Sequence, residues 1–117
     1  MREILFRAKR KIDNRWIEGN FITDEQNLSN AYIGYLFGVD DDGTVHDTDI
    51  AEVDPKTVCQ YTGLTDKNGR KIFEWDCLGH KQNVVEYLSG SFVVSGDRPL
   101  SMMAKYNEVV GNIFDKE

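Results

Sequence analysis

The sequence predicts a mainly β fold, of the β-rich α+β class. Apolar and polar residues alternate with a period of two over short runs, and glycine and Asn/Asp turn signals separate these runs at close spacing. Only one short stretch has helical spacing. We expect a small SH3-like barrel from the C-terminal half, with an N-terminal β-hairpin and an acidic insertion packed on it. The 117 residues suit one domain, 1–117, with the hairpin and insertion in 1–50 and the barrel-like part in 52–115.

The first half begins with a predicted hairpin, in which alternating residues 3–9 return through a reversal at Asp13-Asn14. The apolar, aromatic run after it is bounded by turn signals and predicts a further strand. The elements expected in this half are strands over 3–9 and 16–22, a polar loop over 23–30, a strand over 31–39, a turn over 40–43 and a partner strand over 44–50.

A central stretch, residues 52–78, organises the second half. Pro55 opens it, and Asp66 to Gly69 has the chemistry of a tight reversal, with Asp first and Gly where φ is positive. Asn68-Gly69 is equally suited to the centre of a two-residue hairpin, and both alternatives stay open. The elements expected here are strands over 57–62 and 71–78, a hairpin of 84–88 and 91–94 around Ser89-Gly90, helical turns over 99–106 and a strand over 108–114.

Charge is distributed unevenly along the chain. Residues 1–15 hold six basic groups against two acids, a net of +4, whereas residues 16–55 hold ten acids and no Lys or Arg. We expect the acidic block to contact the basic hairpin, in the same chain or a neighbour's, or to face a cationic partner; a solvated acidic loop is the alternative. The predicted acidic patch consists of Asp40, Asp41, Asp42, Asp47 and Asp49.

Neither a membrane span nor a signal peptide is visible in the sequence, so we expect a cytosolic protein. In that reducing compartment Cys59 and Cys77 are expected to be free thiols, with a disulfide between them as the lesser alternative.

The sequence contains several groups of polar residues that could form a site. Cys77-x-x-His80 with Cys59 and His46 lacks the two close ligand pairs of a zinc site, and the Asp40–Asp49 turn has Gly38 where a calcium loop needs its first ligand. Glu74 and Asp76 lie two positions apart on a predicted strand, so we expect both to point to one face. Paired carboxylates can do acid–base work, but we expect Asp76 to cap backbone amides at a strand bend. The remaining cluster either pins the central loop by hydrogen bonds or forms a polar binding surface; its members are Gln60, Tyr61, Thr62, Asp66, Glu74 and Asp76. We expect no catalytic set, no metal and no cofactor.

Three blocks of sequence carry a family resemblance. They are Ile4–Lys9 with Asp13–Gly19, then Val53–Asp76, and finally Glu108–Phe114. In this order they resemble the YopX family of phage and prophage proteins, although that family usually has glycine where this chain has Ala8, Cys59 and Trp75. The resemblance implies a small β-rich protein encoded by a temperate phage or a prophage, and it implies no catalytic residues.

From these observations we expect a phage or prophage accessory protein of the bacterial host cytosol that is not an enzyme and that binds a protein partner or self-associates as a homo-oligomer. The alternative is a nucleic-acid-related role. In one form the acidic segment mimics DNA and occupies the DNA-binding groove of another protein. In the other form the basic hairpin binds nucleic acid directly, although a pI near 4.9 argues against strong attraction to phosphates.

Overall fold

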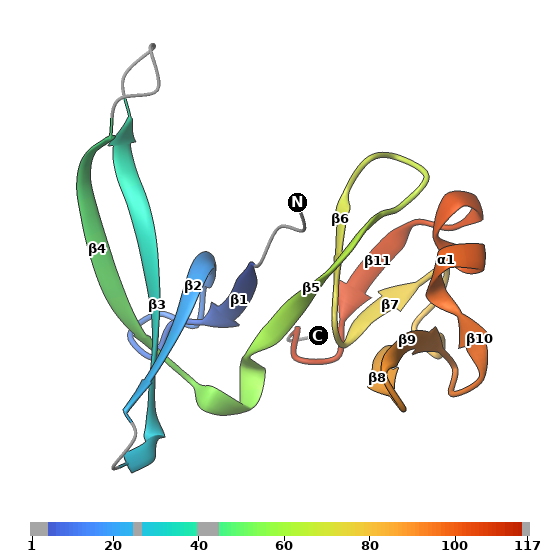
Figure 1. Ribbon diagram of the computed structural model, residues 1–117, viewed down its shortest axis with the longest axis horizontal. Helices are drawn as coiled ribbons and strands as arrows, with labels where there is room; N and C mark the ends of the chain where they lie inside the picture. The colour runs from blue at the N-terminus through green and yellow to red at the C-terminus, as the bar shows by residue number, and fades with distance from the viewer. Residues whose placement is uncertain (1–4, 25–26, 40–44, 116–117) are drawn as a thin grey trace. The chain divides into compact units, whose positions relative to one another are not determined.

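The computed structural model describes residues 5–24, 27–39 and 45–115, and its secondary structure is mainly β (Figure 1). The chain divides into an N-terminal unit, Ile4–Cys59, and a C-terminal unit, Gln60–Glu117. The strands are β1 Phe6–Lys9, β2 Trp16–Asp24, β3 Asn27–Val39, β4 Val45–Val53, β5 Cys59–Thr65, β6 Lys71–Phe73, β7 Asp76–Leu78, β8 Val85–Leu88, β9 Ser91–Val94, β10 Arg98–Pro99 and β11 Val109–Asn112. The helical turns are η1 Pro55–Thr57, α1 Leu100–Met103 and η2 Ala104–Tyr106. No helix among the described residues has the length and apolar character to cross a bilayer.

The N-terminal unit is an antiparallel sheet in the order β4-β3-β2-β1. The predicted first hairpin is confirmed, because Ala8 of β1 lies opposite Ile17 of β2. One cluster of buried apolar side chains lies on this sheet and consists of Ala8, Ala31, Ile33 and Val53. Gly19 allows β2 and β3 to approach closely: a Cβ there would overlap the backbone oxygen of Gly34 and lie 2.9 Å from Ile33 Cγ2.

The expected polar loop over 23–30 is wrong. β2 continues to Asp24 and β3 begins at Asn27, with Thr23 opposite Ala31. Cross-strand backbone pairing overrides the polar composition, since one face of an antiparallel ribbon can be hydrated. The partner strand expected over 44–50 is present as β4, which pairs with β3 as far as Val53 (Figure 1). The expected turn over 40–43 lies outside the described residues.

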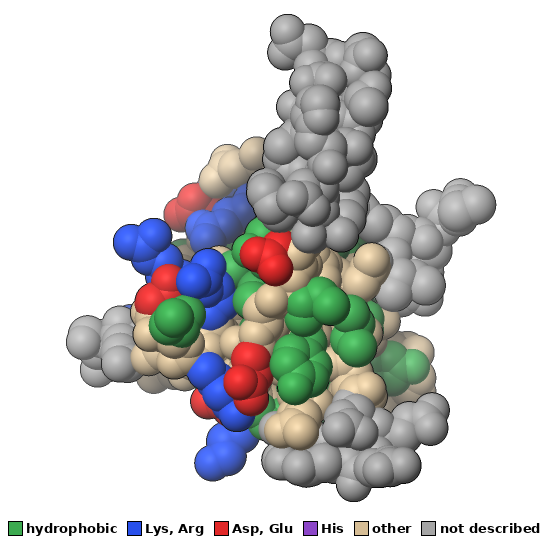
Figure 2. Space-filling view, turned by 90° about the vertical axis from the view of Figure 1, so that its left-hand side faces the viewer, with side chains coloured by type: hydrophobic (Ala, Val, Ile, Leu, Met, Phe, Trp, Pro, Cys, Tyr) green, Lys and Arg blue, Asp and Glu red, His purple; other side chains and the backbone are tan. Residues whose placement is uncertain are grey.

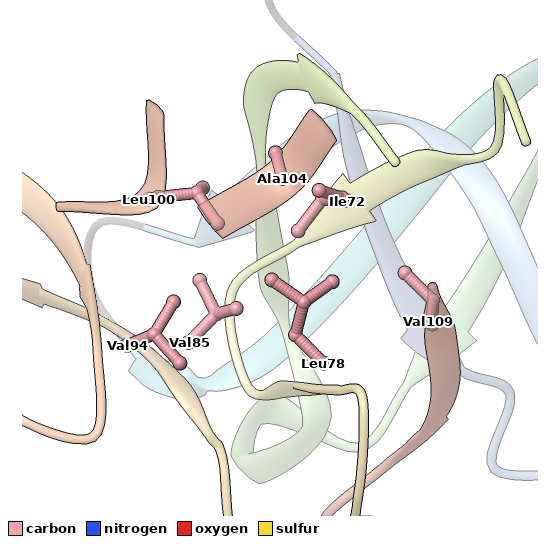
Figure 3. Close-up of a cluster of buried hydrophobic side chains, with 7 residues drawn as sticks. All are labelled: Ile72, Leu78, Val85, Val94, Leu100, Ala104 and Val109. Atoms are coloured by element: carbon pink, nitrogen blue, oxygen red, sulfur yellow. The ribbon is translucent and has the colours of Figure 1, made fainter. Parts of the chain in front are cut away.

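The C-terminal unit surrounds a single cluster of buried apolar side chains (Figure 3). The cluster consists of Ile72, Leu78, Val85, Val94, Leu100, Ala104 and Val109. Its strands pair as β5-β6, β10-β9-β8 and β11-β7, and an isolated bridge joins Cys77 to Val84. The described pairings do not close these strands into a barrel, so the SH3-like barrel remains a prediction.

The strand expected over 57–62 starts later and ends later than predicted. Asp54 accepts a hydrogen bond from the Lys56 N–H (3.0 Å), and Pro55 supports one turn of 3-10 helix, so extended chain begins only at Cys59. β5 then runs to Thr65. Side-chain capping by Asp54 is the local reason for the shift.

The single strand expected over 71–78 is also wrong, since it is broken into β6 and β7. Asp76 accepts a hydrogen bond from the Phe73 N–H (2.8 Å), which turns the chain between them. Trp75 takes a φ of 71° at this bend, in the left-handed region that favours glycine. The family resemblance implies glycine at this position, and the backbone keeps a glycine-like conformation although the side chain is indole.

The remaining turns agree with their predicted chemistry. Asp66 occupies the first position of the central reversal and Gly69 donates to its carbonyl (3.0 Å) with a φ of 82°, which decides between the two alternatives in favour of the Asp-first turn. Ser89 and Gly90, with φ of 50° and 85°, form a two-residue type I′ hairpin turn. The helical turns expected over 99–106 are present as α1 and η2. The last strand is only β11, because its register with β7 shifts after Val109.

Candidate binding surface

The N-terminal unit carries a hollow of about 470 Å³ between its first hairpin turn and β4. Three segments form it: the turn after β1, the middle of β3 and the second half of β4. The lining residues are Arg10, Lys11, Ile12, Tyr35, Asp49, Ile50, Ala51 and Glu52.

The hairpin turn is attached to β4 by main-chain hydrogen bonds. Lys11 donates its N–H to the Glu52 carbonyl (3.0 Å), and Asp54 donates its N–H to the Lys9 carbonyl (2.9 Å). The Lys11 ammonium also lies 3.0 Å from Glu52 Oε2. This ion pair is one contact of the expected kind between the basic hairpin and the acidic block, and it lies within one chain.

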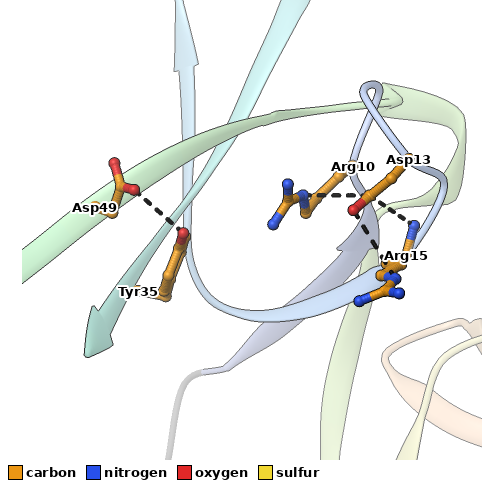
Figure 4. A network of polar contacts seen from close by, with 5 residues as sticks. All are labelled: Arg10, Asp13, Arg15, Tyr35 and Asp49. Carbon is orange, nitrogen blue, oxygen red and sulfur yellow. Dashed lines mark hydrogen bonds and ion pairs between the residues drawn. The ribbon is translucent and has the colours of Figure 1, made fainter. Parts of the chain in front are cut away.

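Charged and hydroxyl groups around the hollow are paired with one another (Figure 4). Asp13 Oδ1 lies 3.3 Å from Arg10 Nε and accepts a hydrogen bond from the Arg15 N–H (3.1 Å). The Tyr35 hydroxyl donates to Asp49 Oδ2 (3.2 Å), and the Ile50 N–H donates to Asp49 Oδ1 (2.8 Å). The carboxylates therefore serve local donors, and opposite charges alternate across the surface, as the face in Figure 2 also shows.

Two apolar side chains next to this hollow are exposed. Ile12 is 83% exposed and Ile50 is 59% exposed. Sequence reasoning did not single out either of them, nor Tyr35. The available signal for Ile12 was its place as the only apolar residue between Lys9 and Arg15. An exposed apolar pair with a polar rim is typical of a protein-binding surface.

An aromatic side chain on the same hairpin lies between two cations. The Arg7 guanidinium is 4.3 Å from the Trp16 ring centroid, and the Lys9 ammonium is 5.4 Å from it. Such cation–π contacts hold the long basic side chains against the strand.

The predicted acidic patch is described only in part. Asp40, Asp41 and Asp42 lie outside the described residues, and of Asp47 only the backbone is described, opposite Phe37. Asp49 is the member that lies in the hollow.

In the C-terminal unit, Asp66 holds the central reversal together. This side chain is only 6% exposed, and its carboxylate accepts from the N–H groups of Asn68 (2.9 Å), Arg70 (2.9 Å) and Val109 (2.8 Å). Burial acts to raise the pKa of Asp66, but these donors and the Arg70 charge outweigh burial and lower that pKa below its ordinary value of 3.8. Thr62 donates its hydroxyl to the Ile72 carbonyl (2.8 Å). Both side chains therefore fix the loop to its strands.

The rest of the predicted polar cluster lies around the bend before β7. Asp76 is fully buried and accepts from Phe73 N–H (2.8 Å) and from Asn112 Nδ2 (2.9 Å), which confirms its predicted capping role. The Tyr61 ring packs on Phe73 with centroids 5.5 Å apart.

Glu74, at the same bend, donates its backbone N–H to the Gln60 carbonyl (2.9 Å). Burial raises the pKa of Glu74, and a hydrogen bond from the Gln60 backbone opposes that rise only in part. Glu74 and Asp76 thus differ in burial and in partners, and the expected shared face of one strand is wrong.

The C-terminal unit has a second hollow, of about 460 Å³, beside β11. Cys77 lies on its wall, and burial, followed by the nearby charges of Asp76 and Asp115, raises the pKa of this thiol. A protonated thiol is a weak nucleophile and metal ligand. Cys59 and Cys77 are both buried and no disulfide joins them, so the disulfide alternative is wrong. Within the described part of the chain, no three His, Cys, Asp or Glu side chains gather as a metal site would need.

Comparison with known proteins gives one family. The sequence model of the family described as YopX protein matches residues 5–116, nearly the whole chain. A comparison with curated proteins found no match.

Proposed function

The chain belongs to the YopX family, and on that premise we propose that it is a phage or prophage accessory protein that works in the bacterial cytosol as a non-enzymatic protein-binding or self-assembling module. The observation that carries this proposal is the presence of two exposed apolar side chains, Ile12 and Ile50, in the lining of the hollow of the N-terminal unit, together with the charged Lys11, Asp49 and Glu52. Apolar centres with polar rims are the usual anatomy of a protein interface. We further propose that the C-terminal unit is an SH3-like scaffold.

The chemistry of the buried polar groups supports a binding role over catalysis. Asp66 and Asp76 are occupied by backbone and side-chain donors, so neither carboxylate is positioned to exchange protons with a substrate. Burial keeps the Cys77 thiol protonated near neutral pH. A general base, a nucleophile and an oxyanion donor would have to converge for catalysis.

Light scattering coupled to size exclusion, together with affinity capture from the bacterial host, tests the proposal. The double variant Ile12→Ser/Ile50→Ser should abolish the self-association or capture seen with the unaltered protein. Met102→Ser is the matched control, since Met102 is 64% exposed but belongs to the C-terminal unit. A wild type that is monomeric at low and high salt and captures nothing specific contradicts the proposal, as does a double variant that behaves like the control.

A nucleic-acid role is the second candidate, because Trp16 with Arg7 and Lys9 combines stacking surface with positive charge. The net charge of −6 opposes this role. Duplex DNA affinity that falls steeply with salt and is lost in Arg7→Gln would support direct binding. Capture of a host DNA-binding protein that is lost when Asp40, Asp41 and Asp42 become Asn would support the DNA-mimic form.

A further inference from the structure

The outer edge of β4 has the properties of a strand-addition site. Among the described strands β4 has one neighbour, β3, and on its other side the Arg10–Lys11 segment covers only the end at Glu52–Val53. We propose that this edge, at Ile50–Glu52, receives an extended, lysine-bearing segment of a partner protein as an added β-strand. This proposal rests on the protein-binding function proposed above. Main-chain pairing with an exposed sheet edge is a recurrent mode of peptide recognition.

The hydrogen bonds identify which main-chain groups face this edge. The Glu52 carbonyl points outward, since it accepts from the Lys11 N–H (3.0 Å). In an antiparallel ladder the residues two positions apart face the same side, so Ile50 turns its N–H and C=O outward as well. The Ile50 N–H donates to Asp49 Oδ1 (2.8 Å), a side chain of its own strand. A neighbouring carboxylate thus satisfies an edge donor, one of the devices that keep edges from pairing indiscriminately.

The chain itself shows which chemistry the edge accepts. Lys11 pairs its backbone with Glu52 and places its ammonium 3.0 Å from the Glu52 carboxylate. An added strand that continues from this point toward Ile50 would next reach the Asp49 carboxylate, and residues 16–55 contain no Lys or Arg. The two cations that line this hollow, Arg10 and Lys11, are paired with Asp13 and Glu52. A second copy of β4 is a poor occupant, because carboxylates would then face carboxylates across the strands. A basic extended segment is the complementary partner.

Binding by this route exchanges one hydrogen bond for another. The Ile50 N–H leaves the Asp49 carboxylate for a carbonyl of the incoming strand, and the released carboxylate then meets the incoming ammonium group. The Tyr35 hydroxyl, 3.2 Å from Asp49 Oδ2, keeps that carboxylate beside the edge. The exposed Ile50 side chain, 59% exposed, offers apolar contact to alternate residues of the added strand.

The test uses a fluorescein-labelled peptide of alternating Lys and Val, six residues long and blocked at both ends, in fluorescence anisotropy. A Lys–Pro peptide of the same length and charge serves as the matched probe, because it cannot form a strand ladder. The variant Ile50→Pro removes the edge donor and spares the pairing of β4 with β3, whereas Ile50→Thr keeps the donor. We expect the Lys–Val peptide to bind, and we expect the Lys–Pro peptide, or the variant Ile50→Pro, to weaken binding at least tenfold. Ile50→Thr loses part of the apolar contact but keeps the edge donor, so it should weaken binding clearly less than Ile50→Pro does.

Several results would overturn strand addition: no binding of the Lys–Val peptide, equal binding of the Lys–Pro peptide, or unchanged binding by a folded Ile50→Pro. Should that variant unfold, amide hydrogen exchange of the unaltered protein decides instead. Protection at Ile50 and Glu52 must then rise when the Lys–Val peptide is added, and constant protection contradicts the proposal. If the peptide fails while the unaltered protein still self-associates or captures a partner, strand addition alone falls and the proposed function stands.

Discussion

Replacing Asp66 by Ala should cost the C-terminal unit about 3 kcal/mol of its free energy of unfolding. The buried Val109 N–H loses its acceptor, which costs about 1–3 kcal/mol. The loop amides of Asn68 and Arg70 can turn to water, so each loses roughly 0.5–1.5 kcal/mol. These losses share one carboxylate and do not simply add, which is why the expected total lies in the lower half of the summed range.

The assay is urea unfolding followed by tryptophan fluorescence. Each unit contains one of the two tryptophans, so a Trp16→Phe background leaves Trp75 as the reporter of the unit that contains Asp66. Asp97→Ala is the control, because Asp97 is an exposed carboxylate whose removal should change stability by less than about 0.5 kcal/mol. A loss below about 1 kcal/mol in Asp66→Ala would refute the structural role assigned to this side chain.

The same carboxylate gives the stability a pH dependence of known sign. The pKa of Asp66 is lower in the folded protein than its ordinary value of 3.8, so the unfolded chain binds more protons between those two values. The stabilisation is therefore fully present above about pH 5, and it is lost as the pH falls through the folded pKa. The gap in stability between the unaltered protein and Asp66→Asn should narrow below pH 4, and a gap that stays constant to pH 3 contradicts the mechanism.

Three further predictions concern single residues. Gly19→Ala should destabilise the protein by about 3 kcal/mol or more, because the new Cβ would overlap backbone atoms. Gly34→Ala should cost under about 1 kcal/mol, because the nearest atom to its new Cβ, at 3.3 Å, is the end of a flexible side chain. Chemical denaturation measures both changes. Ser89→Asn should stabilise by roughly 0.5 kcal/mol in a thermal melt, since Asn adopts the positive φ of this turn more readily than Ser. Iodoacetamide should label Cys59 and Cys77 on the order of 100-fold more slowly in the folded protein than in urea, because both thiols are buried and the pKa of Cys77 is raised. Mass spectrometry measures the labelling, and rapid labelling under native conditions would contradict the burial of the two thiols.

Local chemistry made part of the fold predictable. The Ser89-Gly90 turn depends on two residues that tolerate positive φ. The Asp66 reversal depends on one carboxylate that accepts hydrogen bonds from nearby backbone N–H groups. Both turns could therefore be predicted from short stretches of sequence. The prediction of a loop over 23–30 was wrong because the strand structure there comes from pairing across the sheet, with Thr23 opposite Ala31. The break in the strand predicted over 71–78 was missed because its cause is the Asp76 side chain, which accepts a hydrogen bond from the N–H of Phe73, three residues earlier.

The candidate surface, too, could be predicted only in part. The split between basic and acidic segments predicted a contact, and Lys11 with Glu52 supplies one. No periodicity, however, indicates that Ile12, Tyr35 and Ile50 would line one hollow, because this depends on the register of β3 with β4 and on the path of the turn after β1. The pairing of distant segments is information that a single sequence carries only weakly.

The two groups of buried apolar side chains have no member in common, one built from Ala8, Ala31, Ile33 and Val53 and the other centred on Ile72 and Leu78. Losses from changes without shared partners usually sum. A lineage can thus repack one half of the gene product without a compensating substitution in the other. Among relatives, interior replacements on one side of Cys59 should accordingly vary independently of those on the other side.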